Sequence, residues 1–243
     1  MSAFSKLSAL AVLALAVGLT TSVANAEPAE GKAIYQKCIN CHGVNGQGVK
    51  RFNAPGIAGL QADYVERQLK NFFNIYRGYA YGDVGGHRMR PMARMLKVGQ
   101  STEMSPEMMK SVSEYIASMP TVAPKETLVN GDSDRGSVIY AKICKSCHGA
   151  DAGGMAGLGP DLRYSGDWYL LTQLKNFKEK RRAGRDLKEC SGLVPPEQCD
   201  PQGMSMVKKV WPAKEPNKFL PDEQSMKDVI AYIMRLARNT SGQ

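Results

Sequence analysis

The 243 residues allow one or two domains of ordinary size. The formal charge of +9 is spread over both halves of the chain, but no nucleic-acid-binding motif accompanies it, so nucleic acid is not expected as a partner. The densest basic run, from Lys175 to Lys188, is either a solvated face or a surface that steers docking onto an acidic protein or an anionic membrane.

The first 26 residues have the features of a secretory signal peptide. Lys6 precedes an apolar run from Leu7 to Val17, and the small-residue sequence Ala24-Asn25-Ala26 follows, so cleavage is expected before Glu27. The apolar run is shorter than the roughly 20 residues that a membrane-spanning helix requires, which makes a membrane anchor the weaker interpretation. The sequence therefore predicts export to the periplasm and a soluble mature protein.

Two copies of the sequence Cys-x-x-Cys-His, at Cys38–His42 and Cys144–His148, are the most informative motifs of the chain. The two thiols of each copy lie one helical turn apart, so both can form thioethers with the vinyl groups of a haem, and the histidine that follows can ligate the iron. A thiol redox pair or half of a zinc site is the alternative, but two of the chain's three histidines lie in these motifs. The motifs predict two covalently bound c-type haems. The predicted haem-binding residues are Cys38, Cys41, Cys144 and Cys147 as thioethers, and His42 and His148 as iron ligands.

The motifs belong to a longer internal repeat. The sequence Gln-Leu-Lys-Asn-Phe occurs at 68–72 and again, 105 residues later, at 173–177. Nearer the C-terminus the matching Tyr-Ile pairs, at 115–116 and 232–233, are 117 residues apart, so the second unit contains an insertion. The repeat predicts a first domain over residues 27–119, a linker over 120–130 that begins with a helix-stopping proline, and a second domain over 131–243.

Each unit is predicted to be helical, which makes the fold class all-α. One short helix leads into the haem motif, and an amphipathic helix spans roughly 62–76, or 167–180 in the second unit. A last helix places Val112, Tyr115 and Ile116 on one face. Units of roughly 100 residues would have thin cores by themselves, so we expect each domain to wrap around its haem, which supplies the missing apolar mass.

The sixth ligand of each iron is expected to be a methionine, because thioether sulfur makes a six-coordinate haem suited to electron transfer. Met89 and Met206 occupy the same register in the two units, each six residues after an aspartate and three after a glycine. They are the predicted ligands. The alternatives are Met92, Met95 and His87 in the first unit and Met204 in the second.

Cys190 and Cys199 lie outside the haem motifs and close a short loop that is rich in proline and glycine. Disulfides persist in an oxidising compartment, so we expect a disulfide between them. A structural clip is favoured over a redox switch.

The order of these segments resembles that of the dihaem class I c-type cytochromes of the cytochrome c4 family. The match covers nearly all of the mature chain, and Met89-Arg-Pro-Met-Ala93 is similar to the ligand loop of that family, whose first methionine binds iron. The match around Met206 is looser. The resemblance implies two tandem cytochrome c domains related by a pseudo-twofold axis, with their haem edges close together. It also implies that the carbonyl groups of Pro55 and Pro160 accept the ring N–H of the axial histidines.

The resemblance further implies an electron carrier, not an enzyme. Its expected role is to shuttle single electrons from a quinol-oxidising complex or a dehydrogenase to a terminal oxidase. One alternative is the dihaem electron-accepting subunit of a periplasmic dehydrogenase for a sulfur compound, sulfide or an alcohol. The other is an enzyme, such as a peroxidase, with an exchangeable sixth ligand. The Lys178–Cys199 insertion, which simpler members of the family lack, is either a partner surface or a shield for the second haem. Arg88, Arg90 and Tyr164 are the candidates for contacts with the haem propionates.

Overall fold

The computed structural model describes residues 27–183 and 200–240. Over these ranges the chain forms helices and two isolated β-bridges, with no strand, so the all-α prediction is confirmed. Within them, too, no helix is long and apolar enough to cross a membrane. The predicted signal peptide and the Cys190–Cys199 disulfide lie outside the described residues.

The first domain places its N-terminal helix across its C-terminal one. Gly31 lies at the crossing, where a β-carbon would stand 2.1 Å from the carbonyl oxygen of Ser111, so only glycine permits this approach. Next to it the rings of Tyr35 and Tyr115 pack with their centroids 5.5 Å apart. The elements of this domain are α1 (Glu27–Tyr35), α2 (Ile39–His42), the 3-10 turn η1 (Lys50–Phe52), α3 (Ala62–Phe73), α4 (Val84–Ala93) and α5 (Pro106–Ser118).

The second domain repeats this arrangement. A β-carbon on Gly136 would lie 1.9 Å from the carbonyl oxygen of Asp228, and the rings of Tyr140 and Tyr232 are 5.3 Å apart. Gly31 and Tyr35 recur 105 residues later as Gly136 and Tyr140, so the same two residue types mark the helix crossing in both domains. The elements here are α6 (Ser133–Ile143), α7 (Lys145–His148), α8 (Asp167–Lys178), α10 (Pro201–Val210) and α11 (Glu223–Thr240).

The amphipathic helices are shorter than predicted, and two further helices were not predicted. The amphipathic helices end at Phe73 and Lys178, before the predicted ends at 76 and 180, because Ile75 and Lys180 adopt left-handed backbone angles (φ of 64° and 56°) that no helix accommodates. The predicted methionine ligands lie on short helices, α4 and α10. These helices are hard to predict because they contain glycines, and α4 also contains Pro91, and both residue types disfavour a helix.

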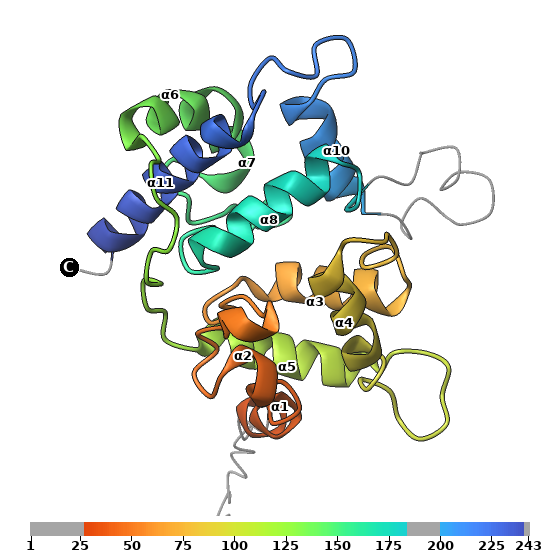
Figure 1. Ribbon diagram of the computed structural model, residues 1–243. Helices are drawn as coiled ribbons and strands as arrows, with labels where there is room; N and C mark the ends of the chain where they lie inside the picture. Colours follow the sequence, from red (N-terminus) through yellow and green to blue (C-terminus); the bar gives the residue numbers. More distant parts are fainter. Residues whose placement is uncertain (1–26, 184–199, 241–243) are drawn as a thin grey trace, which may run out of the picture.

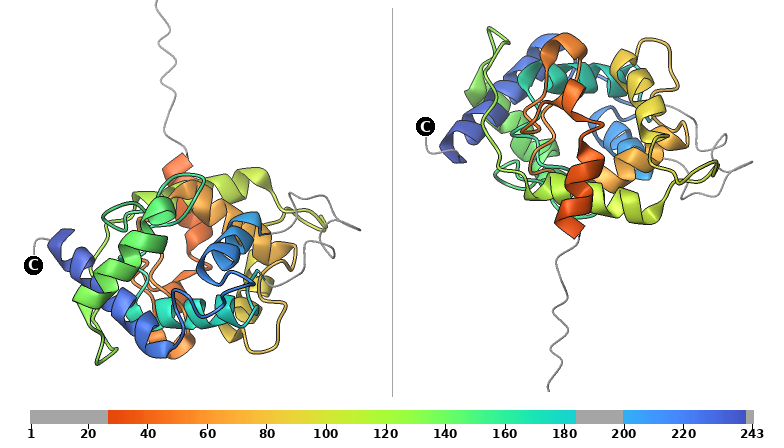
Figure 2. Two further views of the ribbon diagram at one scale, coloured as in Figure 1. Left: turned by 90° about the horizontal axis from the view of Figure 1, so that it is seen from above. Right: turned by 90° about the horizontal axis from the view of Figure 1, so that it is seen from below.

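The two domains lie side by side, with α3 and α8 facing each other across the interface (Figures 1 and 2). Each domain has its own apolar core. Residues 120–130, the predicted linker, contain no helix or strand and run along one side of the pair. Thr127 ties this segment to both domains, since its hydroxyl group donates to Asp167 over 2.9 Å and accepts from Lys50 over 3.0 Å.

Candidate haem sites

A single cavity of about 570 Å³ extends across the interface between the two domains. Both Cys-x-x-Cys-His motifs open into it, and most of its wall is apolar, with Leu60, Val112, Leu170 and Ile233 among the lining residues. An apolar cavity with thiol and imidazole groups on its wall fits a covalently attached haem in each half. Because the two halves are continuous, the two haem positions are neighbours.

The histidine of each motif is held in one orientation. Nδ1 of His42 lies 2.9 Å from the carbonyl oxygen of Pro55, and Nδ1 of His148 lies 2.9 Å from that of Pro160. A carbonyl oxygen only accepts, so the proton of each imidazole is on Nδ1 and the lone pair of Nε2 is free for a metal. Burial lowers the pKa of both histidines below the usual value, although the carbonyl contacts oppose this, so both rings are neutral at pH 7.

A tyrosine fixes the turn that follows each motif. The hydroxyl group of Tyr35 donates to the carbonyl oxygen of Gly43 over 2.7 Å, and that of Tyr140 donates to Gly149 over 2.8 Å. These tyrosines recur in the sequence 105 residues apart, at the same offset as the Gln-Leu-Lys-Asn-Phe repeat. Tyr35 and Tyr140 lie eight and nine residues before the glycines that they contact, and this nearly equal spacing was the available signal for the role.

Cys38 and Cys144 do not have the lowered pKa of a reactive thiol. Burial raises the pKa of Cys38 to about 11 and that of Cys144 to about 12, whereas reactive cysteines have lowered values. In the described part of the chain, no cluster of three or more His, Cys, Asp or Glu side chains is placed to hold a metal ion. The burial of Cys38 and Cys144 thus favours haem attachment over thiol redox chemistry.

The structure separates the candidates for the sixth ligand. Met89 on α4 and Met206 on α10 line the cavity. His87 is exposed and does not line the cavity. Met95 and Met204 do not line it either. Met92 also lines the cavity and stays an alternative in the first domain.

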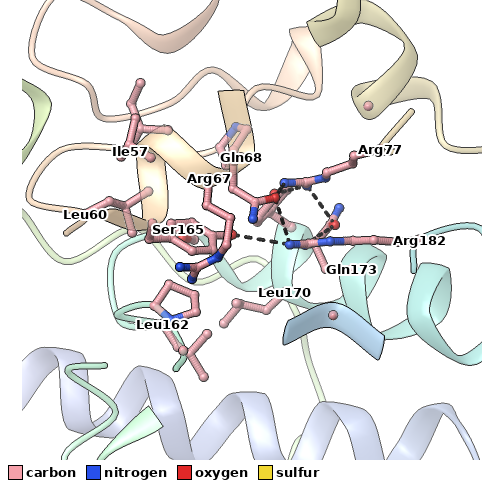
Figure 3. Close-up of a pocket in the computed structure, with 18 of the residues that line it drawn as sticks. Ile57, Leu60, Arg67, Gln68, Arg77, Leu162, Ser165, Leu170, Gln173 and Arg182 are labelled. Atoms are coloured by element: carbon pink, nitrogen blue, oxygen red, sulfur yellow. Dashed lines mark hydrogen bonds between the residues drawn. The ribbon is translucent and has the colours of Figure 1, made fainter. Parts of the chain in front are cut away.

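Two buried arginines that the sequence analysis did not single out meet at the interface (Figure 3). Arg77 donates to Gln68 of its own domain over 2.7 Å and to Gln173 of the other domain over 3.0 Å. Arg182 donates to the same two glutamines, over 2.8 Å to Gln173 and 3.1 Å to Gln68. Tyr169 accepts a further hydrogen bond from Arg77. These five residues, which we call the arginine–glutamine cluster, all line the cavity.

The backbone places both arginines by the same turn. After α3 and α8 the left-handed residues Ile75 and Lys180 reverse the chain, and the N–H groups of Arg77 and Arg182 each donate over 3.0 Å to the carbonyl oxygen of an asparagine in the helix, Asn71 or Asn176. A positive φ at a β-branched residue such as Ile75 is strained, and this strain is tolerated where the turn serves a purpose. Here the turn points a guanidinium group into the cavity.

The cluster has capacity for an anion. Nε of Arg77 and Nε of Arg182 are buried without a hydrogen-bond partner, and the carboxylate of Asp200 is 4.0 Å from the latter. Burial alone would lower the pKa of Arg77, but Tyr169, Tyr64 and Asp83 outweigh it and raise the pKa, so the guanidinium stays charged. Two buried cations on the wall of an apolar cavity fit the carboxylate groups of the haems. Of the residues expected in this role, Arg90 and Tyr164 do not line the cavity, and Arg88 lines it but is exposed and donates to the carbonyl of Phe52.

Comparisons with known proteins agree with this site. The cytochrome c family matches residues 28–120 and 133–237. The thiosulfate dehydrogenase electron acceptor of Thiomonas intermedia is 31% identical over 155 residues, which are 62% of this chain and 66% of that relative. The fold is that of reduced cytochrome c4 from Pseudomonas stutzeri, with a TM-score of 0.57, 19% identity and coverage of 85% of this chain and 97% of that one.

A second structure, thiosulfate dehydrogenase TsdBA from Marichromatium purpuratum, has a TM-score of 0.61 and 19% identity. It covers 85% of this chain, which spans only 40% of that protein. At this level of identity both structures show the shared fold. The chain therefore belongs to the cytochrome c family: it is a dihaem class I c-type cytochrome, similar in fold to cytochrome c4, that carries two covalently bound haems and serves as an electron carrier.

Proposed function

We propose that this cytochrome shuttles single electrons in the periplasm from a respiratory donor, such as a quinol-oxidising complex or a dehydrogenase, to a terminal oxidase. The observation that carries the proposal is the continuous cavity that both haem motifs share. Neighbouring haems let an electron enter through one domain and leave through the other. The chain then needs two docking faces and no substrate pocket.

We further propose the residues that hold the haems. Cys38, Cys41, Cys144 and Cys147 form the thioethers. His42 and Met89 ligate the first iron, and His148 and Met206 ligate the second, with Pro55 and Pro160 supporting the histidines. The support is that all ten residues line the cavity and that the imidazole Nε2 atoms are free.

Haem iron supplies the one-electron couple, and the residues of the chain set its properties. The proline carbonyls hold the imidazole proton on Nδ1 and make the ring a better electron donor. The methionine sulfur and the apolar wall favour the reduced state and exclude water, which raises the reduction potential. The buried arginines compensate the negative charge of the propionates.

Met89→Ala is expected to abolish the far-red methionine-to-iron absorption band of the first haem and to lower its midpoint potential, because the iron loses its soft ligand. An absorption spectrum of the oxidised protein and a redox titration measure both effects. Met95→Ala is the matched control, since Met95 is 44% exposed and lies outside the cavity. A band that survives Met89→Ala and disappears in Met92→Ala would assign the ligand to Met92 instead.

A second candidate role rests on a specific observation: a relative is named as a thiosulfate dehydrogenase electron acceptor, and TsdBA shares the fold. In this role the cytochrome accepts electrons directly from a dehydrogenase that oxidises a sulfur compound. Anaerobic mixing of the oxidised cytochrome with a thiosulfate dehydrogenase and thiosulfate tests it. Haem reduction faster than by thiosulfate alone supports this role, and its absence favours the quinol-linked one.

With both iron positions filled, the reduced protein is expected not to bind carbon monoxide at neutral pH. The absorption spectrum before and after addition of carbon monoxide measures this. Binding at one haem would show an exchangeable sixth ligand and would turn the assignment from a carrier to an enzyme. Met206→Ala, which opens the second iron, is the positive control.

A further inference from the structure

Gln61 of the first domain reaches into the haem loop of the second domain. Its side-chain Nε2 donates to the carbonyl oxygen of Gly153 over 2.9 Å, and its Oε1 accepts from the backbone N–H of Asp161 over 3.1 Å. The amide group thus joins the two ends of the segment 153–161. Gln61 immediately precedes α3, which faces α8 of the other domain (Figure 1).

The segment that Gln61 holds contains Pro160, whose carbonyl oxygen accepts the Nδ1 proton of His148 over 2.9 Å. The neighbouring residue Asp161 is buried and forms an ion pair of 2.7 Å with Arg163, which anchors this end of the segment within its own domain. Gly154 anchors the other end through a 2.9 Å bond from its N–H to the carbonyl of His148. The position of the Pro160 carbonyl is therefore fixed by these contacts within the second domain and by Gln61 of the first domain.

The segment is shaped to receive this side chain. Gly154 has a φ of +83°, and a β-carbon at this position would stand 2.1 Å from Nε2 of Gln61. A residue other than glycine would therefore displace the glutamine. Asp63, two residues further on, adds a 2.8 Å hydrogen bond from the N–H of Gly157 to its carboxylate. The start of α3 thus makes three hydrogen bonds to the haem loop of the other domain.

The second domain cannot return this contact. The residue that precedes α8, and so corresponds to Gln61, is Gly166, which has no side chain. The equivalent loop of the first domain contains Gly56, and it faces the backbone carbonyl of Tyr164 of the second domain. A β-carbon on Gly56 would lie 2.2 Å from that oxygen. The contact made by the Gln61 side chain therefore has no counterpart at this position of the second domain, and it runs only from the first domain to the second haem site.

We infer that Gln61 is a positioning residue through which the first domain sets the hydrogen bond between His148 and Pro160, and with it the electronic properties of the second haem. This inference rests on the proposed ligation of the second iron by His148. A strong Nδ1–H to carbonyl bond makes the imidazole a better donor to iron. Loosening the loop weakens that bond, so the midpoint potential of the second haem rises while that of the first does not change.

The test compares the holo protein with Gln61→Leu, which keeps the size of the side chain and removes both hydrogen bonds. In the reduced protein we expect the ring N–H of His148 to exchange with solvent at least tenfold faster in the variant, measured by NMR, and that of His42 to exchange as before. A redox titration with haem-resolved NMR signals is expected to show a higher potential at the second haem alone. Equal changes at both haems, or no change at either, would overturn the inference.

Two further variants make the result specific. Gln61→Glu keeps the acceptor for Asp161 and loses the donor to Gly153, so it is expected to give a smaller change of the same sign. Tyr79→Phe removes a different contact between the domains, the 3.1 Å bond to the carbonyl of Lys180, and is expected to leave the exchange of His148 unchanged. If the wild-type protein showed no protected ring N–H of His148 and no methionine-to-iron band, the proposed ligation would fail. If both are present and Gln61→Leu changes neither the exchange rate of His148 nor the potential of the second haem, only the role of Gln61 fails.

Discussion

Replacement of both Cys144 and Cys147 by serine is expected to give a protein with one haem and an unfolded second domain. Without the thioethers the second haem is not retained, and half of the cavity of about 570 Å³ is left empty. At about 24 cal/mol per Å³ this costs roughly 7 kcal/mol. Domains are stable by only about 5–15 kcal/mol, so the loss is enough to unfold a small one.

Haem content per chain, circular dichroism and limited proteolysis measure this result. Roughly half of the helical signal is expected to disappear, and protease is expected to cut within the second domain while the first stays intact. Ser146→Ala, which changes the motif but keeps both cysteines, is the control and is expected to retain both haems. A variant with one haem and the full helical signal would show that the second domain folds without its haem.

Arg182→Met is expected to destabilise the protein by about 3–5 kcal/mol and to lower the potentials of the haems. Arg182 is 6% exposed and donates to glutamines of both domains, so its loss leaves Asp200 buried without its nearest cation. The loss of a buried positive charge next to the haem propionates also favours the ferric state. Chemical denaturation monitored by haem absorbance and a redox titration measure the two effects.

The neighbouring residue supplies a matched control. Arg181 forms a surface ion pair with Glu179 and its side chain is 41% exposed, so Arg181→Met is expected to cost less than about 1 kcal/mol and to leave the potentials unchanged. Because Arg77 and Arg182 share both glutamines, the double variant is expected to be non-additive. Additive effects would mean that the two arginines act independently. Unchanged haem potentials in Arg182→Met would mean that the arginine–glutamine cluster does not bind the haem propionates.

Some elements of the site were not found in the sequence although a signal was present. Arg77 and Arg182 each follow the repeated Gln-Leu-Lys-Asn-Phe sequence by five residues, so they are in register. They were overlooked because they stand beyond the ends of the helices, in turns whose left-handed residues, Ile75 and Lys180, carry no glycine signature. Helices α4 and α10 were not predicted because their glycines disfavour a helix. They are stabilised at their N-termini by Asp83 and Asp200, whose carboxylates accept hydrogen bonds from the backbone.

The sequence by itself determined that the chain is a repeated helical protein with two covalent haem sites. Cys-x-x-Cys-His is a local motif whose chemistry needs only one helical turn, and the internal repeat predicts two equivalent domains. Only the tertiary structure decided that the two sites share one cavity, that two buried arginines meet there, and that Gln61 reaches the loop of Pro160. These contacts join residues 92 to 114 positions apart, and no local pattern in a chain specifies which side chains meet across a domain interface.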